Sequence, residues 1–107
     1  MGKVLQGILI AGSEMRDAVK SGEKLITIRE GHRDYSLGPV LIGCHLLDWA
    51  VLGEITQVIH TRLKDVSYEN LVSDGFSSHA QAVATLQQWY SDINMDSKVT
   101  VIKWKLK

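Results

Sequence analysis

The stretch GEKLITIR, residues 22–29, joins the end of a predicted helix to the start of a predicted strand. Gly22 suits the position just after a helix, and the β-branched residues 26–28 favour a strand. Side chains alternate along a strand, so Thr27 and Arg29 are predicted to share one face. Lys24 would lie on the other face of a regular strand. We therefore expect the chain to bend between Gly22 and residue 25, so that Lys24 and Thr27 line one cleft.

The residues before this stretch predict a strand and a two-turn helix. The apolar run at 4–10 is typical of a short strand, and it ends at a glycine. Ser13 is a good helix N-cap, and Gly22 suits the end of the same helix. Met15, Ala18 and Val19 have helical spacing, which predicts one buried helix face.

The residues after it predict a polar loop, three further strands and two more helices. The loop is expected at 31–38, strands at 40–47 and 50–61, and a short helix at 67–72. Gly53 suggests a bulge or bend in the second of those strands. Ser78 with Gln81 forms a capping box for a helix whose apolar stripe is Val83, Leu86 and Tyr90. Residues 99–106 alternate with period two, which predicts a terminal strand.

This order of elements predicts an α+β fold. It lacks the regular strand–helix alternation of a doubly wound parallel sheet. We expect a small mixed β-barrel of about five to six strands with two or three short helices, formed by residues 1–107 as a single domain.

Composition excludes several classes of function. The 107 residues contain 12 Lys and Arg against 12 Asp and Glu, so bulk positive charge cannot supply affinity for a polyanion, and any nucleic-acid contact must be local. There is no apolar run of membrane-spanning length and no signal-peptide pattern, and a single cysteine fits a reducing compartment. We therefore expect a cytoplasmic protein without a membrane partner.

The common catalytic and cofactor motifs are missing from the sequence. It contains no GxGxxG, Walker, HExxH or GxSxG pattern, and we expect no metal and no cofactor. The four histidines lack metal-ligand spacing, which favours structural or solvent-exposed roles for His32, His45, His60 and His79. Cys44 and His45 are adjacent on a predicted strand and point to opposite faces, so Cys44 is predicted to be buried and inert.

Residues 22–29 also form the pattern G-x-K-x-x-T-x-R, which resembles the signature of the ASCH domain family, a branch of the PUA-like superfamily. Tyr35 and Gly38 stand where the family often has an aromatic residue and a glycine. The stretch DGFSS at 74–78, leading into a helix, and VTVI at 99–102, in a closing strand, are also similar to this family. The resemblance covers essentially the whole chain.

The resemblance implies a PUA-type β-barrel with a cleft beside the signature strand that receives RNA or modified nucleosides. Some small bacterial members are amidohydrolases that remove the acetyl group of N4-acetylcytidine with a lysine, a threonine and an acidic residue. By position these are Lys24, Thr27 and Asp74, although the acidic residue is usually Glu, which is one methylene longer. Other members are ribonucleases or presumed RNA binders, so a noncatalytic RNA-binding or nucleotide-binding module is the alternative.

The chemistry of these residue types is compatible with amide hydrolysis. Thr27 offers a hydroxyl nucleophile, and Arg29 can bind a developing oxyanion. Lys24 is a base only when neutral, and the charge of Asp74 opposes that form unless the two groups share a proton. Without the resemblance, Lys24 is a solvated turn residue, Thr27 a strand former and Arg29 the partner of a surface carboxylate.

The remaining candidates are aromatic and basic side chains. Arg33 and Tyr35, in the polar loop, are predicted to bind the substrate by stacking on a base or pairing with phosphate. The alternative for Tyr35 is packing over the core. Core or rim packing, and not a platform for a base, is the expectation for Trp49, Trp89 and Trp104. Lys103, Lys105 and Lys107 are expected to form the solvated face of an edge strand, with a weak phosphate track as the alternative.

Overall fold

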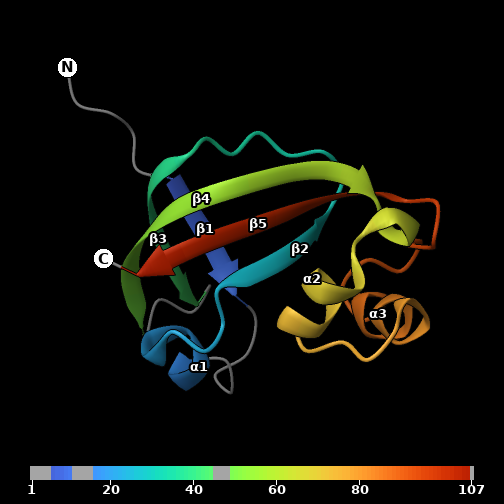
Figure 1. Cartoon of the computed structure of the whole chain (residues 1–107), viewed down its shortest axis with the longest axis horizontal. Coiled ribbons are helices and arrows are strands. Elements are labelled where there is room, and N and C mark those ends of the chain that lie inside the picture. Colours follow the sequence, from blue (N-terminus) through green and yellow to red (C-terminus); the bar gives the residue numbers. More distant parts are fainter. Residues whose placement is uncertain (1–5, 11–15, 45–48, 107) are drawn as a thin grey trace.

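The computed structural model describes residues 6–10, 16–44 and 49–106. Nine elements follow one another along the chain (Figure 1). They are β1 (Gln6–Ile10), α1 (Arg16–Ser21), β2 (Ile26–Glu30), β3 (Gly38–Cys44), β4 (Ala50–Arg62), the 3-10 helix η2 (Leu63–Asp65), α2 (Tyr68–Ser73), α3 (His79–Leu86) and β5 (Lys98–Leu106).

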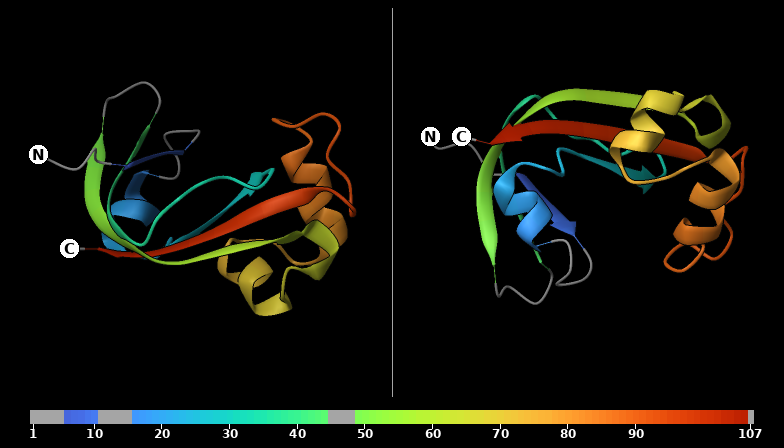
Figure 2. Two further views of the ribbon diagram at one scale, coloured as in Figure 1. Left: turned by 90° about the horizontal axis from the view of Figure 1, so that it is seen from above. Right: turned by 60° about the horizontal axis from the view of Figure 1, so that its bottom comes forward.

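The five strands form one mixed sheet in the order β1-β3-β4-β5-β2. β1 pairs with β3 in parallel, and the other neighbours are antiparallel. β1 and β2 are therefore the two edges of the sheet. Figure 2 shows that the long strands β4 and β5 bend, so the sheet curls into a half-barrel. The predicted α+β class with a small curled sheet is confirmed.

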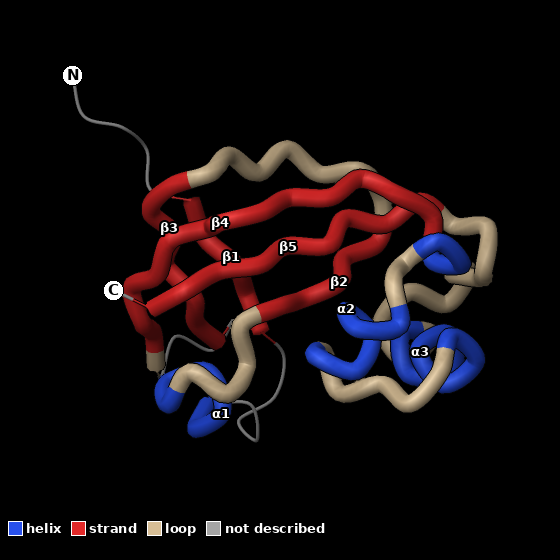
Figure 3. The backbone as a smooth tube through the Cα atoms, viewed as in Figure 1, coloured by secondary structure: helices blue, strands red, loops and turns tan. Residues whose placement is uncertain are grey.

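Two apolar cores lie on the two faces of this sheet. The inner core packs Val19 of α1 against sheet residues, Ile102 and Trp104 of β5 among them. The second core packs residues of α2 and α3, such as Leu71 and Leu86, against the opposite face. Figure 3 shows α2 and α3 next to each other at one end of the sheet, with α1 at the other end. β5 is buried on both faces because both cores meet on it.

Local signals in the sequence placed the helices correctly. The Ser67 and Ser78 hydroxyls accept hydrogen bonds from the backbone N–H groups of Asn70 and Gln81, as N-caps of α2 and α3. Gly22 follows α1 with φ +84°, the left-handed conformation expected after a helix. Among the positions used for prediction, Ser13, Met15, His45 and Lys107 lie outside the described residues, as does the side chain of Cys44.

The structure differs from the predictions in four details. The bulge of β4 lies between Ile55 and Gln57, whereas Gly53 stays in register; a Cβ on Gly53 would come within 2.9 Å of the Lys105 carbonyl oxygen. The strand with the terminal lysines is central, because β5 lies between β4 and β2. Trp89 is 57% exposed and is not part of either core. α3 ends at Leu86, so Tyr90 packs from the turn that follows it.

The loop at 31–37 is fixed to the sheet at several points. The buried Thr100 hydroxyl donates to the Gly31 carbonyl oxygen at 2.6 Å and accepts from the Arg33 N–H at 2.8 Å. The Gln6 side chain, on β1, exchanges two hydrogen bonds with the backbone of Ser36. The loop is therefore tied to both β5 and β1.

Replacing Thr100 by Val is expected to loosen this loop. The change keeps the β-branched shape but leaves the Arg33 N–H and the Gly31 carbonyl without their partner, which should lower the free energy of unfolding by about 1–3 kcal/mol. Urea denaturation measures this loss, and hydrogen exchange at the Arg33 amide reports it locally. Thr85→Val, on α3, is the control. Equal stability and equal exchange in the two variants would contradict a fastening role for Thr100.

Candidate functional site

Lys24 lies in the bend that leads from α1 into β2. Its backbone N–H donates to the Ala18 carbonyl oxygen at 2.9 Å, which folds the chain back over the end of α1. Gly22 makes the turn possible through its positive φ. The Lys24 amine then forms an ion pair and hydrogen bond with the Asp74 carboxylate. The predicted bend is confirmed, and Lys24 is not a solvated turn residue.

Asp74 caps the carboxyl end of α2 and lies against the edge of the sheet. Its backbone N–H donates to the carbonyl oxygens of Asn70 and Leu71. Gly75 follows with φ +92° and turns the chain away. The Asp74 carboxylate accepts a hydrogen bond from the backbone N–H of Ile28, on the edge strand β2. The end of α2 and the edge strand β2 thus meet at the Asp74 carboxylate.

Burial controls the electrostatics of the pair. The side chains of Lys24 and Asp74 are 13% and 6% exposed. Loss of hydration raises the pKa of Asp74 above its ordinary value of 3.8, against the opposing effects of Lys24, the nearby Arg29 and the Ile28 N–H. Asp74 therefore holds its proton more readily than an exposed aspartate does.

Thr27 and Arg29 lie on the inner face of β2. Thr27 is 7% exposed and stands opposite Ile102 of the inner core, while Arg29 stands opposite Thr100. No hydrogen bond joins Thr27 to Lys24 or Asp74. The shared cleft of Lys24 and Thr27 therefore stays a prediction. Lys24 and Arg29 are both close enough to Asp74 for their positive charges to lower its pKa.

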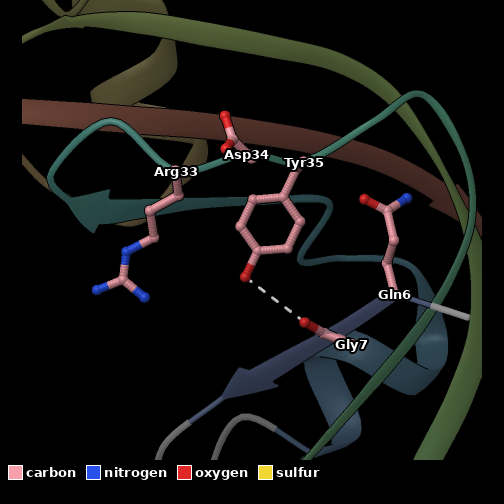
Figure 4. A pocket seen from close by; sticks show the side chains of 5 residues that line it. All are labelled: Gln6, Gly7, Arg33, Asp34 and Tyr35. Atoms are coloured by element: carbon pink, nitrogen blue, oxygen red, sulfur yellow. Dashed lines mark hydrogen bonds between the residues drawn. The ribbon is translucent and has the colours of Figure 1, made fainter. Parts of the chain in front are cut away.

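Arg33 and Tyr35 line a separate open hollow of about 360 Å³ (Figure 4). Gln6 and Gly7 of β1 and Asp34 of the loop complete its lining. The Tyr35 hydroxyl points to the Gly7 carbonyl oxygen at 3.5 Å, and the ring packs against the inner core. Lys24, Thr27 and Asp74 do not line this hollow. The candidate residues thus form two groups, one at the β2 edge and one beneath the loop.

Some atoms of the candidate site could not be predicted from the sequence. The Ile28 N–H and the lining positions Gln6, Gly7 and Asp34 carry no motif, because their roles depend on the curl of the sheet.

Three histidines form hydrogen bonds to backbone carbonyl groups, as their predicted structural role requires. The acceptors are the oxygens of Thr61 for His32, Arg33 for His60 and Val66 for His79.

The described part of the chain contains no group of three or more potential metal ligands. It also contains no helix that is both long enough and apolar enough to cross a membrane.

Comparison with solved structures gives a similar fold. The chain superposes on the crystal structure of an ASCH domain from Lactobacillus crispatus JV V101 with a TM-score of 0.74, and the match covers 95% of this chain and 79% of that one. Sequence identity is 16%, so the likeness concerns the fold. No protein-family model matches the sequence, and no curated protein matches it.

The raised pKa of Asp74 predicts how stability depends on pH. Between the ordinary value near 3.8 and the raised folded value, the folded state binds more protons than the unfolded state. The contribution of Asp74 to the unfolding free energy therefore falls as pH rises through this window, and Asp74→Asn should lack that fall.

Urea denaturation of both proteins from about pH 3.5 to pH 8 measures the difference. Asp96→Asn, which alters a carboxylate that is 76% exposed and paired with Lys64, is the control and should change stability by less than about 1 kcal/mol. A wild-type advantage over Asp74→Asn that grows with pH across the window would show that the pKa of Asp74 is lowered instead.

Proposed function

We propose, on the premise that the chain has the fold of an ASCH domain, that it acts on RNA or modified nucleosides by hydrolysing the acyl amide of N4-acetylcytidine. The observation that carries the proposal is the buried contact between the Lys24 amine and the Asp74 carboxyl group, which has a raised pKa. The motif G-x-K-x-x-T-x-R supports the same assignment. The single cysteine cannot form an internal disulfide, which agrees with a cytoplasmic location for this activity.

The Lys24–Asp74 pair can provide the base for the reaction. An amine is a base only when it lacks its extra proton. Burial raises the pKa of the Asp74 carboxyl group, so this group holds a proton more readily than an exposed aspartate and can share it with the Lys24 amine through their hydrogen bond.

The proposed reaction passes through an acyl-enzyme. The Thr27 hydroxyl oxygen attacks the acetyl carbonyl carbon, its proton passes to the Lys24 amine, and Arg29 stabilises the oxyanion. Collapse breaks the C–N bond, and the Lys24 proton goes to the leaving N4 nitrogen, which releases cytidine. Water then adds to the Thr27 ester with Lys24 again as base, and acetate leaves as the Thr27 hydroxyl regains a proton.

The hollow beneath the loop, which Lys24, Thr27 and Asp74 do not line, is the proposed place for a base other than the acetylated one. Tyr35 is half-buried with a ring against the inner core, which holds an aromatic surface for stacking on a base. The Arg33 Nε donates to the Glu30 carbonyl oxygen at 2.9 Å, which fixes the guanidinium and leaves its terminal nitrogens for a substrate. The same features favour the second candidate function, a noncatalytic RNA-binding or nucleotide-binding module.

Three substitutions test the catalytic proposal. Lys24→Arg keeps the positive charge and the ion pair but cannot act as a base, so kcat should fall by about 10²–10⁴-fold while the fold stays intact. Thr27→Val removes only the hydroxyl and should have a similar effect. Asp74→Glu restores the length usual in the acetylcytidine-cleaving members, and its activity shows to which length the site is adapted.

The assay incubates purified protein with acylated and unmodified nucleosides and detects products by mass. Lys20→Arg, on the exposed side of α1, is the matched control for Lys24→Arg and should keep full activity. Wild-type turnover that survives both Lys24→Arg and Thr27→Val would remove these residues from the mechanism. Saturable binding without any product would favour the binding module.

Tyr35 can be tested independently of turnover. If its ring stacks on a base, Tyr35→Ala should weaken the binding of a nucleoside or short RNA by about 1–3 kcal/mol. Tyr35→Phe keeps the ring, loses only the 3.5 Å contact to the Gly7 oxygen, and should bind nearly as well as the wild type. Calorimetric titration measures both. Equal affinity in Tyr35→Ala would leave that residue with a packing role alone.

A further inference from the structure

The outer face of the sheet, which carries the second core, is covered by helices at one end. There α2 and α3 pack with Val99 and Val101 of β5, whereas Lys105, on the same face of this strand, is exposed. Figure 3 shows both helices at the end of the sheet away from β3. On β3 and the first half of β4 the outer face meets solvent, and Leu41 and Leu52 are 42% and 47% exposed there.

The exposed part of the outer face is apolar. Leu41 and Leu52 are direct cross-strand partners, so their side chains stand next to each other. Alternation along the two strands puts Pro39 and Ala50 on the same face, and both are exposed. We call Pro39, Leu41, Ala50 and Leu52 the β3–β4 apolar face. A sheet face that meets only water normally carries polar side chains at such positions, so this composition indicates a face that another surface covers.

One side of the β3–β4 apolar face carries a charge of each sign. Glu54 is the cross-strand partner of Pro39 on one side and of Lys105 on the other. The Lys105 Nζ lies 3.6 Å from the Glu54 Oε2, and both side chains reach solvent. The whole chain has no net formal charge, so two copies do not repel each other as they approach.

We propose that the β3–β4 apolar face joins two copies of this chain in a symmetric dimer. A two-fold axis that passes between Leu41 and Leu52, inclined to the strands, stacks the leucine pairs of the two copies on each other. The same axis brings Glu54 towards the partner's Lys105, so each copy supplies the charge that the other needs. A partner with one dominant charge would set a like charge against either Glu54 or Lys105, which favours a second copy over an acidic or a basic protein.

The size of the β3–β4 apolar face predicts a weak dimer. A stable interface buries about 800 Å² of each partner, and four residues supply only the apolar centre of such a contact. We therefore expect a dissociation constant of about 10–100 µM. The Lys24–Asp74 pair lies at β2, the edge of the sheet farthest from β1 and β3 in the strand order, so the dimer does not use it. The proposal is thus independent of the proposed function.

Sedimentation velocity of the full chain, from about 2 to about 500 µM, tests the dimer. Leu41→Glu and Leu52→Glu each set a charge in the centre of the contact and should raise the dissociation constant about tenfold or more. Val72→Glu, an equivalent change at an exposed side chain of α2, is the control and should dimerise like the wild type. Circular dichroism checks that all variants stay folded. A monomer over the whole range, or equal association in the two leucine variants, would overturn the proposal.

The charges beside the leucines allow a test that leaves the apolar face itself unchanged. Glu54→Lys and Lys105→Glu each give a chain whose two charges have the same sign, so each variant alone should dimerise less than the wild type. In an equimolar mixture of the two variants, every contact across the axis again joins opposite charges. The mixture should therefore associate more strongly than either variant, and added salt should reduce this gain. A mixture that associates no better than its components would overturn the proposed pairing.

The order of the assembly tests its symmetry. A two-fold contact uses the same face of both copies, so association stops at two chains. Sedimentation equilibrium of the wild type at the highest concentration should give a mass no greater than that of two chains. Continued growth with concentration would reveal a head-to-tail contact between different faces and would overturn the symmetric arrangement. These measurements need no substrate, so neither result bears on the proposed hydrolysis.

Discussion

The buried contact between the Lys24 amine and the Asp74 carboxyl group is the constraint on which the arrangement of helices and sheet depends. An unpaired charge at this depth would destabilise the fold by several kcal/mol. Asp74 finds its partners on segments that flank or form β2, namely the Lys24 amine and the Ile28 N–H. The end of α2 is thereby fixed against the edge strand β2. The Ile28 N–H of β2 is occupied by this contact, so it is no longer open to pairing with another strand.

The loop at 31–37 depends on a second buried polar group. Thr100 has no exposed surface and lies on a strand that both cores cover, so its hydroxyl must find partners inside the protein. It finds them in the loop backbone, which places Arg33 and Tyr35 over the inner face. Gln6 holds the far end of the loop to β1. The hollow is thus formed by chain segments that meet only because the sheet curls.

Local signals predicted the fold well, and long-range pairing decided what they missed. The cap at Ser78, the turn at Gly22 and the β-branched run before Arg29 depend on nearby residues, and the structure agrees with each of them. Val99 and Thr100 lie on opposite faces of β5, and both are buried, as expected for a central strand. The alternating pattern at 99–106 was interpreted as one buried and one solvated face, so it did not predict this central position.

The candidate site divides in the same way. The bend at Lys24 was predictable from Gly22, but its contact with Asp74 spans 50 residues and was available only from the family resemblance. That contact uses one of the three protons of the Lys24 ammonium group, and no other side-chain hydrogen bond of Lys24 exists among the described residues. The Lys24 side chain is 13% exposed, so the N–H groups that do not contact Asp74 are open to solvent or to a substrate atom. Asp74 is enclosed by Lys24 and the β2 edge, so in the proposed function it acts through the Lys24 amine.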